Sequence, residues 1–294
     1  MKKFLLEILK YFILVSFLFS LIFTAVYFII STASFDIPKD RNILIVGDSH
    51  TACSIDDAIF THSVNMSQGG TAYLYSYIKV RKFINENPHI DTVLVSFHGT
   101  GITKGMDEFT TGERYILKDI PWHISLLKTD ELPVFIFKPS FYSALAKVPL
   151  KHIRAVFRYI VGYSLTYNDL YIGGYERTDR ERLEKAIERE ESNEYKESGF
   201  SEYQLKFLLK IIELCKEKNV RIILISTPIY NVERYGYLPE LNSFYNTYLS
   251  GVQFLDFSTF AMPDYGYGDI DHLNYKGAEI FSRYLENNYD TIFK

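Results

Sequence analysis

The sequence predicts an α/β fold in which strands and helices alternate around a parallel sheet. Five short apolar runs have the length of buried strands, at residues 42–46, 62–66, 92–97, 221–226 and 252–255. Segments with helical spacing of apolar residues separate them, and this alternation is typical of parallel strands joined by right-handed crossovers. The chain has 294 residues, of which 47% are hydrophobic and 23% charged, so it can bury a sizeable core.

The amino terminus predicts a single membrane-spanning helix. Tyr11 to Ile30 is a run of twenty residues without a charge, enough to cross a hydrocarbon core of about 30 Å. Three lysines precede the run, and the next basic residue is Lys39. The positive-inside rule therefore places residues 1–10 in the cytoplasm and 11–31 as an anchor in the cytoplasmic (inner) membrane, with the rest outside the cytoplasm. A cleaved signal peptide is the alternative, although its apolar core is usually about 7–15 residues long.

A tether at residues 32–41 leads into a domain at 42–294. The elements expected in this domain are strands at the five runs above, a short helix at 54–60, and helices at 71–86, 202–218, 239–248 and 275–288. Ser201 with Gln204 forms a capping box for the third of these helices. Asn274 is the expected N-cap of the last helix.

A mostly helical insert is expected at about residues 118–199. Residues 138–168 carry five Lys and Arg and no acidic residue, with aromatic residues interleaved. Such a stretch can lie on an anionic membrane or bind an anionic polymer, or it can be a helical pair packed on the main domain with its basic side in solvent. Residues 176–197 are rich in Glu and Arg, which predicts a solvated helix without a chemical role.

Composition also limits the partners. The net charge of −4 gives no reason to expect a nucleic acid partner. No Cys/His or carboxylate cluster has the spacing of metal ligands, and no glycine-rich phosphate loop is present, so neither a metal nor a cofactor is expected.

A serine stands at the end of the first predicted strand. Ser49 follows the apolar run 43–46 through Gly47 and Asp48. Ligands of open α/β sheets bind just outside the carboxyl ends of the strands, which is where a nucleophile would act. A nucleophilic serine needs a base and a third group that orients the base.

His272 is the best candidate for the base among the seven histidines. It lies in a turn-rich loop between the last strand and the last helix. Asp269 precedes it by three residues, which lets the loop fold this carboxylate onto the imidazole. Asp271 is adjacent in sequence and would usually point elsewhere.

These two segments resemble the motifs of the SGNH (GDSL-type) esterase and acyltransferase family. Gly47-Asp48-Ser49 lies near the start of the domain, and Asp269-x-x-His272-Leu273-Asn274 precedes its final helix. The resemblance covers roughly residues 42–117 and 201–294. It implies a flavodoxin-like three-layer α/β/α fold with five parallel strands, in which Ser49 attacks an ester carbonyl, His272 is the base and Asp269 orients it.

The same resemblance implies an oxyanion hole built from the Ser49 N–H, a glycine N–H and an asparagine side chain. Residues 65–70 match the block that supplies the glycine, and the spacing favours Gly70 over Gly69 as the donor. The two glycines would also suit a strand-to-helix turn.

The third block departs from the family pattern, because His98-Gly99-Thr100 stands where Gly-x-Asn would be. Either the Thr100 hydroxyl or a ring N–H of His98 would then replace the asparagine, since losing one oxyanion donor typically lowers the rate by about 10²–10³. Asp48 is expected to support the nucleophile turn through hydrogen bonds to loop N–H groups. His50 is expected to line the acyl pocket or to cap the following helix.

The function predicted from the sequence is that of a membrane-anchored, extracytoplasmic serine esterase or O-acyltransferase. An acyl-serine intermediate would carry an acetyl or other short acyl group from a small-molecule or glycan ester, with cell-envelope or exported glycans as the expected substrates. A transferase would also need a membrane partner that passes acyl groups outward. The alternative is a non-catalytic scaffold or glycan-binding module, which the altered third block favours.

Overall fold

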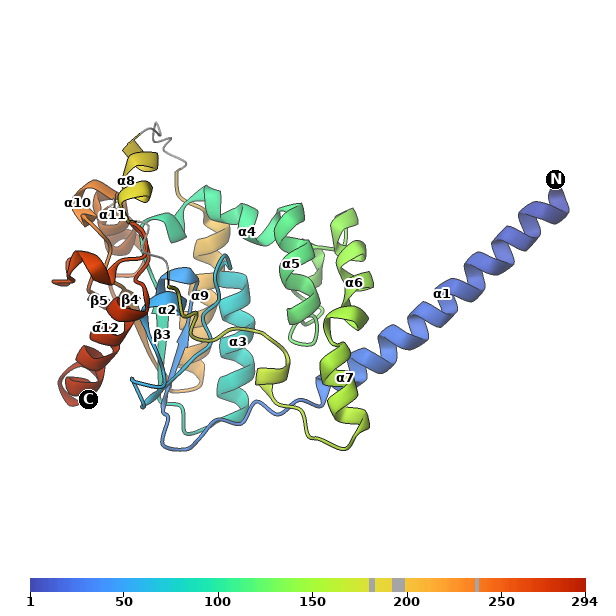
Figure 1. The fold of residues 1–294 in the computed structure, drawn as a ribbon, viewed down its shortest axis with the longest axis horizontal. Coiled ribbons are helices and arrows are strands. Elements are labelled where there is room, and N and C mark those ends of the chain that lie inside the picture. The colour runs from blue at the N-terminus through green and yellow to red at the C-terminus, as the bar shows by residue number, and fades with distance from the viewer. Residues whose placement is uncertain (180–182, 192–198, 236–237) are drawn as a thin grey trace. The chain divides into compact units, whose positions relative to one another are not determined.

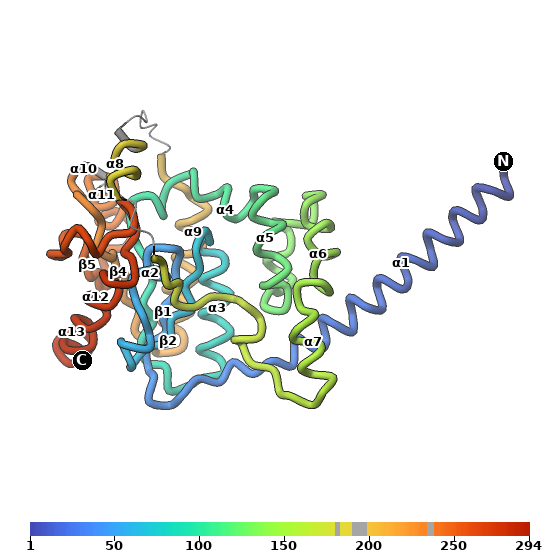
Figure 2. The backbone as a smooth tube through the Cα atoms, in the orientation of Figure 1, coloured from blue at the N-terminus to red at the C-terminus, as the bar shows by residue number. Residues whose placement is uncertain are grey.

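The computed structural model describes residues 1–179, 183–191, 199–235 and 238–294, which divide into two compact units (Figure 1). The helical unit comprises residues 1–35 and 113–172, and the sheet unit comprises residues 36–112 and 173–294. The chain therefore enters the sheet unit at Asp36, leaves it after Gly112 and returns at Gly173 (Figure 2).

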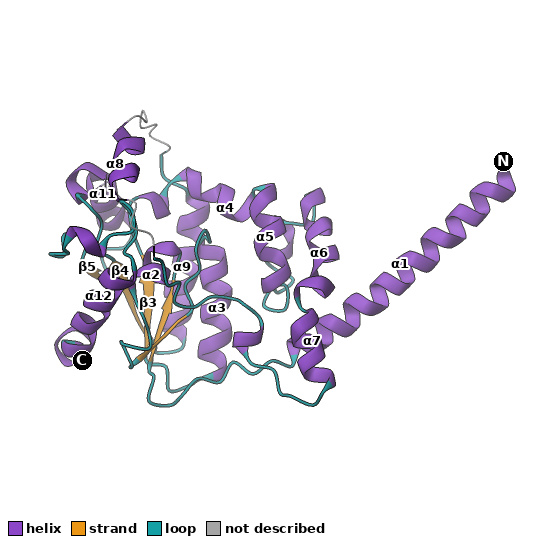
Figure 3. Ribbon diagram, in the orientation of Figure 1, coloured by secondary structure: helices purple, strands orange, loops and turns teal. Residues whose placement is uncertain are grey.

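Five parallel strands form the sheet of the sheet unit (Figure 3). They are β1 (Ile43–Val46), β2 (Ser63–Asn65), β3 (Thr92–Ser96), β4 (Arg221–Ser226) and β5 (Gln253–Asp256). Their order across the sheet is β2-β1-β3-β4-β5, and every neighbouring pair is parallel. This is the order of flavodoxin-like doubly wound sheets. The predicted fold class is confirmed.

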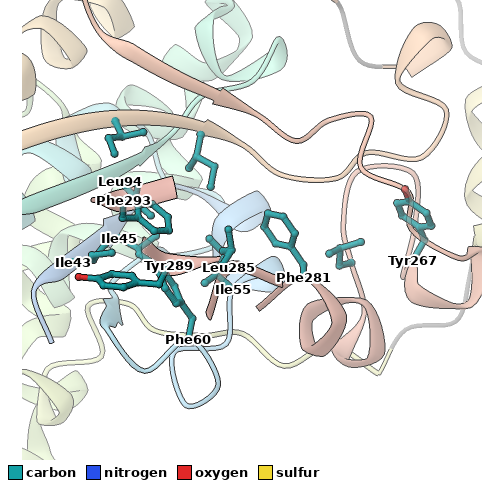
Figure 4. Close-up of a cluster of buried hydrophobic side chains, with 13 residues drawn as sticks. Ile43, Ile45, Ile55, Phe60, Leu94, Tyr267, Phe281, Leu285, Tyr289 and Phe293 are labelled. Atoms are coloured by element: carbon teal, nitrogen blue, oxygen red, sulfur yellow. The ribbon is translucent and has the colours of Figure 1, made fainter. Parts of the chain in front are cut away.

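The central strands are buried on both faces, which explains their unbroken apolar sequences. Every residue of β1 and β3 is buried. Leu44 lies in register between Val64 of β2 and Val93 of β3. One core cluster joins strand residues to side chains of the carboxyl-terminal helices (Figure 4), and its members include Ile43, Ile45, Leu94, Phe281, Leu285, Tyr289 and Phe293.

The helices of the sheet unit follow most of the predicted ranges. They are α2 (Ser49–Ser54), α3 (Tyr73–Glu86), α4 (Glu108–Thr111), α8 (Leu183–Glu191), α9 (Glu202–Glu217), α10 (Val232–Tyr235), α11 (Leu238–Tyr248), α12 (Tyr275–Asn287) and α13 (Tyr289–Phe293). Helix α3 packs against α9, and α2 packs against α12. The helices predicted at residues 71–86, 202–218, 239–248 and 275–288 are confirmed to within two residues at each end.

The helix predicted at residues 54–60 is wrong. Helix α2 begins at Ser49, because the Asp48 side chain accepts a hydrogen bond from the His50 N–H and so caps the helix five residues earlier. It ends at Ser54. The Asp56 carboxylate then accepts the Ala58 N–H at 3.0 Å, which favours a turn over further helix.

The helix predicted at residues 176–197 is only partly observed. Residues 183–191 form α8, whereas 180–182 and 192–198 lie outside the described residues. Residues 173–179 are not helical and belong to the sheet unit. This segment, which we call the strap, passes through the site described below.

The helical unit contains the apolar amino-terminal helix and the helices of the insert. They are α1 (Lys2–Ser31), α5 (Glu113–His123), α6 (Pro139–Lys151) and α7 (Ile153–Ile160). Helix α1 is long and apolar enough to cross a membrane, a property that membrane anchors share with signal sequences. Only Val26 and Ile30 of its residues are buried. Helix α5 packs against α6, and both α6 and α7 contact α1.

Asn274 fixes the loop that leads into α12. Its side-chain oxygen accepts the N–H groups of Lys276 and Gly277 at 2.9 and 3.2 Å, as predicted for the N-cap. Its amide donates to the carbonyls of Tyr265 and Tyr267 at 2.8 and 3.0 Å. The residue is buried, so both sides of this junction depend on one side chain.

We expect Asn274→Ala to lower the free energy of unfolding by about 1–3 kcal/mol, because it removes the cap and leaves buried carbonyls unpaired. Asn274→Asp keeps the two accepted bonds and should lose less. Chemical unfolding of the detergent-solubilised chain measures both changes. Wild-type stability in Asn274→Ala would contradict the role given to this side chain.

Candidate active site

Ser49, His272 and Asp269 form a continuous chain of hydrogen bonds. The His272 Nε2 lies 2.7 Å from the Ser49 Oγ, and its Nδ1 lies 2.7 Å from the Asp269 Oδ1. A proton on Nδ1 is donated to the carboxylate, which leaves Nε2 to accept the serine hydroxyl proton. The structure thus brings together the three residues that the sequence assigns to nucleophile, base and orienter.

The backbone explains why Asp269, rather than its neighbour, meets the imidazole. The Asp269 Oδ1 also accepts the N–H groups of Asp271 and His272 at 3.0 and 2.9 Å, so a tight turn holds the carboxylate against the ring. Burial alone would raise the pKa of Asp269, but the hydrogen bond and charge of His272 and these two N–H groups lower it below its usual value. The carboxylate therefore stays ionised and able to hold His272.

The turn between β1 and α2 is organised by the buried carboxylate of Asp48. Besides capping α2, it accepts the Ser96 hydroxyl at 3.2 Å and lies 2.6 Å from the His98 Nε2. The predicted support of the turn by this side chain is confirmed by its bond to the His50 N–H. Burial acts to raise the pKa of Asp48, yet the charges and hydrogen bonds of His98 and His50 hold it well below its usual value.

His50 lies against His98 rather than at the helix cap. The two rings stack with their centroids 3.6 Å apart and an interplanar angle of 24°, and the His50 ring lies 5.3 Å from that of His272. Its buried Nδ1 lies 3.4 Å from the Asp48 Oδ1, a contact that is an ion pair when the ring is protonated. Since Asp48 caps α2, the cap role is excluded for His50, and a cavity-lining role remains.

Asp48, His50 and His98 are also the one group of side chains in the described ranges that could hold a metal ion. Their ligand atoms lie within 4.8 Å of one another, and all three residues are buried. No local sequence pattern points to this group, because His98 follows Asp48 by fifty residues. Its shortest contact, 2.6 Å between Asp48 and His98, is a charge-assisted hydrogen bond. This bond joins Asp48 and His98 beneath the turn that carries Ser49, and the His50 Nδ1 lies 3.4 Å from the same carboxylate.

The two candidate glycine donors differ in their surroundings. The Gly69 N–H donates to the Glu176 Oε1 at 2.8 Å, so a carboxylate of the strap occupies it. Gly70 has a φ of +65°, which favours glycine, and it lines a cavity together with Ser49. Within the described part of the chain, no group accepts a hydrogen bond from the Gly70 N–H. This difference favours Gly70 as the donor.

The side chains of the third block bind each other. The Thr100 Oγ1 lies 2.9 Å from the His98 Nδ1, while the His98 Nε2 bonds to Asp48. Both ring nitrogens of His98 are thus engaged, which argues against a ring N–H aimed at an oxyanion. With Nε2 carrying the proton for Asp48, Nδ1 accepts, so the Thr100 hydroxyl proton is directed to His98.

Two cavities meet at Ser49 and His272. The larger, about 790 Å³, is polar, and four strap residues line it: Glu176, Arg177, Thr178 and Asp179. The smaller, about 320 Å³, is lined by Gly70, Thr100, Gly105, Met106 and Phe109, among others. Ser49 therefore lies between the larger cavity, which is lined by charged side chains of the strap, and the smaller cavity, which has Met106 and Phe109 in its wall.

The strap is the functional segment that the sequence analysis missed. The Gly174 N–H donates to the Ser67 carbonyl at 2.9 Å, and the Glu176 N–H donates to the Ala52 carbonyl at 2.8 Å. The Arg177 guanidinium lies 4.0 Å from the centre of the Tyr275 ring at the start of α12. The strap thus ties together α2, the loop after β2 and α12.

One sequence signal could have located the strap. Residues 173 and 174 are both glycines, and paired glycines often mark a close backbone approach. A Cβ on Gly173 would lie 2.4 Å from the Met66 carbonyl oxygen, so no side chain fits there.

Comparisons with known proteins leave the family open. No curated protein matches the sequence significantly. One family model, which has no functional description, matches residues 162–294, less than half of the chain.

Solved structures that resemble the chain share little sequence with it. A proposed acylhydrolase from Bacteroides fragilis NCTC 9343 is 9% identical, with a TM-score of 0.39, and the match covers 90% of this chain and 92% of that one. A GDSL-like lipase from Bacteroides thetaiotaomicron VPI-5482 is 9% identical, with a TM-score of 0.39 and coverage of 88% and 92%. A proposed platelet activating factor from Streptococcus pneumonia is 13% identical, with a TM-score of 0.40 and coverage of 96% of each chain. TM-scores this low carry no conclusion, so the site rests on its own geometry.

The lowered pKa of Asp48 predicts how acid affects stability. A carboxyl whose folded pKa lies below its unfolded value of about 3.9 stabilises the fold above that pH, and the contribution is lost as the pH falls through the folded pKa. Asp48→Asn should therefore be less stable than wild type at neutral pH and lose less stability on acidification below about pH 4. Unfolding measured as a function of pH tests this, with the exposed Asp40→Asn as the control. An unchanged pH dependence in Asp48→Asn would contradict the assignment.

Proposed function

We propose that this chain is an SGNH-type serine esterase or O-acyltransferase, anchored in the cytoplasmic membrane with its sheet unit outside the cytoplasm. The proposal rests on two hydrogen bonds of the His272 ring, each 2.7 Å long: one joins Nε2 to the Ser49 Oγ, and the other joins Nδ1 to the Asp269 Oδ1. These residues sit at the carboxyl ends of a parallel sheet and border two cavities. A nucleophile, a general base and a carboxylate that orients the base, joined in this order, are what acyl transfer to a serine requires.

The reaction begins with attack of the Ser49 Oγ on the ester carbonyl carbon while the His272 Nε2 takes the hydroxyl proton. The tetrahedral intermediate collapses as His272 returns that proton to the leaving alcohol oxygen, which leaves an acyl-Ser49. Water or a second hydroxyl then loses a proton to His272 and attacks the acyl carbon. The second tetrahedral intermediate collapses as the acyl–Oγ bond breaks and His272 returns the proton to the Ser49 Oγ, which regenerates Ser49 and releases a carboxylic acid or a new ester.

The two cavities suit the two halves of an ester. The smaller has Met106 and Phe109 in its wall, which fits an acetyl or other short acyl group. The larger offers Glu176 and Asp179 as acceptors and Arg177 as a donor, which fits the hydroxyl groups of a glycan or another polyol. A transferase would draw its acyl group from a membrane partner, since α1 is the one candidate span in the described ranges.

The oxyanion in this proposal is stabilised by the N–H groups of Ser49 and Gly70. Thr100 takes part through His98, to which its hydroxyl is bonded at 2.9 Å, rather than as a third donor. His98 in turn holds Asp48, so the departure from the family pattern strengthens the turn that carries the nucleophile.

Labelling with a fluorophosphonate probe tests the nucleophile. The detergent-solubilised wild type should be labelled, whereas Ser49→Ala and His272→Ala should not. Asp269→Asn should lower the rate by about 10³–10⁴, because the base loses its orienting carboxylate. Asp271→Asn changes the neighbouring carboxylate, which borders the smaller cavity but makes no hydrogen bond to the His272 ring among the described residues, and it should lower the rate far less than Asp269→Asn.

Absence of labelling in a wild-type chain with native circular dichroism would overturn the proposal and favour a non-catalytic scaffold or glycan-binding module. Hydrolysis and transfer are separated by mass spectrometry of the products when an acetyl ester is supplied with and without a polyol acceptor.

The Thr100→Val variant tests the composition of the oxyanion hole. We expect kcat/KM for an acetyl ester to fall by less than about tenfold, whereas loss of a true oxyanion donor lowers it by about 10²–10³. Thr100→Ser retains the hydroxyl and is the control. A loss of the larger size in Thr100→Val, restored in Thr100→Ser, would make the hydroxyl a direct donor and contradict the two-donor assignment.

A further inference from the structure

We propose that α7 and the end of α6 form a membrane-surface element that lies in the anionic headgroup region of the bilayer crossed by α1. The inference rests on the proposed role of α1 as a membrane span, but it is independent of the esterase chemistry. The proposed partner of this surface is a membrane leaflet that contains anionic lipid.

An exposed apolar stripe runs along α7 and the last turn of α6. Leu150, Ile153, Phe157 and Ile160 have 74%, 65%, 66% and 71% of their surface exposed. Ile153, Phe157 and Ile160 are spaced by four and three residues, which places them on one face of α7, and Leu150 precedes them at the end of α6. Ala155, between them in sequence, is buried. It is the one buried residue of α7, so the helix leaves its large apolar side chains at the surface.

The stripe is too continuous to be ordinary surface. Single exposed apolar residues are normal, but contiguous exposed patches mark sites of association with a protein or a membrane. Val161 and Tyr163 follow the stripe and are 49% and 60% exposed, so the apolar surface continues past the end of α7.

The charge beside the stripe favours an anionic occupant. Residues 138–168 contain five basic residues and no acidic one. Arg158 pairs with Asp169 at 3.0 Å, but Lys147, Lys151 and Arg154 are exposed and have no carboxylate partner among the described residues. Cationic side chains beside an apolar stripe are typical of helices that lie in the interface of an anionic membrane.

The position of α7 within the helical unit fits this occupant. Helix α1 contacts both α6 and α7, and its buried residues, Val26 and Ile30, lie in its last two turns. The Ser34 N–H donates to the Leu165 carbonyl at 2.9 Å, which joins the segment after α1 to the loop after α7. Helix α7 thus lies beside the end of the apolar run, where α1 would leave the hydrocarbon core and enter the headgroups.

The test uses tryptophan fluorescence, because Trp122 is the one tryptophan of the chain. In a Trp122→Phe background, Phe157→Trp places a probe in the stripe, and Ile160→Trp is a second probe in case the first disturbs folding. Leu209→Trp is the matched control, since Leu209 is an apolar residue 42% exposed on α9 of the sheet unit. The full chains are reconstituted into phosphatidylcholine vesicles with and without phosphatidylglycerol.

In vesicles containing phosphatidylglycerol, the stripe probes should emit at shorter wavelength than the control and be quenched by phosphatidylcholine brominated on its acyl chains. They should also resist quenching by aqueous iodide, whereas the control should be quenched by iodide. Replacing Lys151 and Arg154 with glutamine should reduce this protection toward the level in vesicles of phosphatidylcholine alone.

Two results would overturn the proposal. Stripe probes as open to iodide as the control, in vesicles with anionic lipid, would show that the stripe faces water. Probes shielded from both iodide and brominated lipid would show that a protein surface, such as a second copy of the chain, covers the stripe. Neither result depends on esterase activity, so failure of this inference is distinct from failure of the proposed function.

Discussion

Asp48 places a carboxylate charge where water scarcely reaches, and the rest of the site is arranged around the need to compensate that charge. The side chain takes a backbone N–H from α2, a hydroxyl from the end of β3 and a ring nitrogen of His98. These contacts join the carboxyl ends of two neighbouring strands to the first turn of α2. An unpaired buried carboxylate would be strongly unfavourable, so the three elements are held in one arrangement. The position of Ser49, the next residue, follows from it.

A second carboxylate, that of Asp269, holds His272 on the other side of the candidate site. Asp269 fixes His272 through the side chain and the backbone at once, and Asn274 anchors the loop to α12. The strap then links α12 to α2 and the loop after β2. Nucleophile, base and candidate oxyanion donor come from segments far apart in sequence, and their relative positions depend on these few polar side chains. Buried polar networks of this kind specify one geometry because a partly satisfied network is unfavourable.

The helical unit differs from the sheet unit in how much of its apolar surface is exposed. Its inner face is buried among its own helices, while α1 and the stripe on α7 leave large apolar side chains exposed. Such surfaces are stable only if something other than water covers them. The sheet unit shows the opposite pattern, with its strands covered by its own helices. The two units therefore differ in where their large apolar side chains lie: exposed along α1 and α7 in the helical unit, and buried around the sheet in the sheet unit.

Local sequence was sufficient for the strands, most helices, the Asn274 and Ser201 N-caps and the proximity of Ser49, His272 and Asp269, because short apolar runs, capping residues and the Asp269–His272 turn act over a few residues. The capping box predicted at Ser201 is only half formed, because the Gln204 side chain bonds to Asp107 and Tyr73 instead. Local sequence failed at residues 54–60, because the Asp48 cap makes the helix begin at Ser49 instead of Ser54. It also failed in the strap, because Glu176 was assigned to a solvated helix and the strap is not helical. It favoured Gly70 over Gly69 by spacing alone, and it left the roles of His98 and Thr100 undecided. Those depend on contacts across fifty or more residues, such as Asp48 with His98 and Gly69 with Glu176. Hydrogen bonds at such separations have no local signature, so only the tertiary structure could decide them.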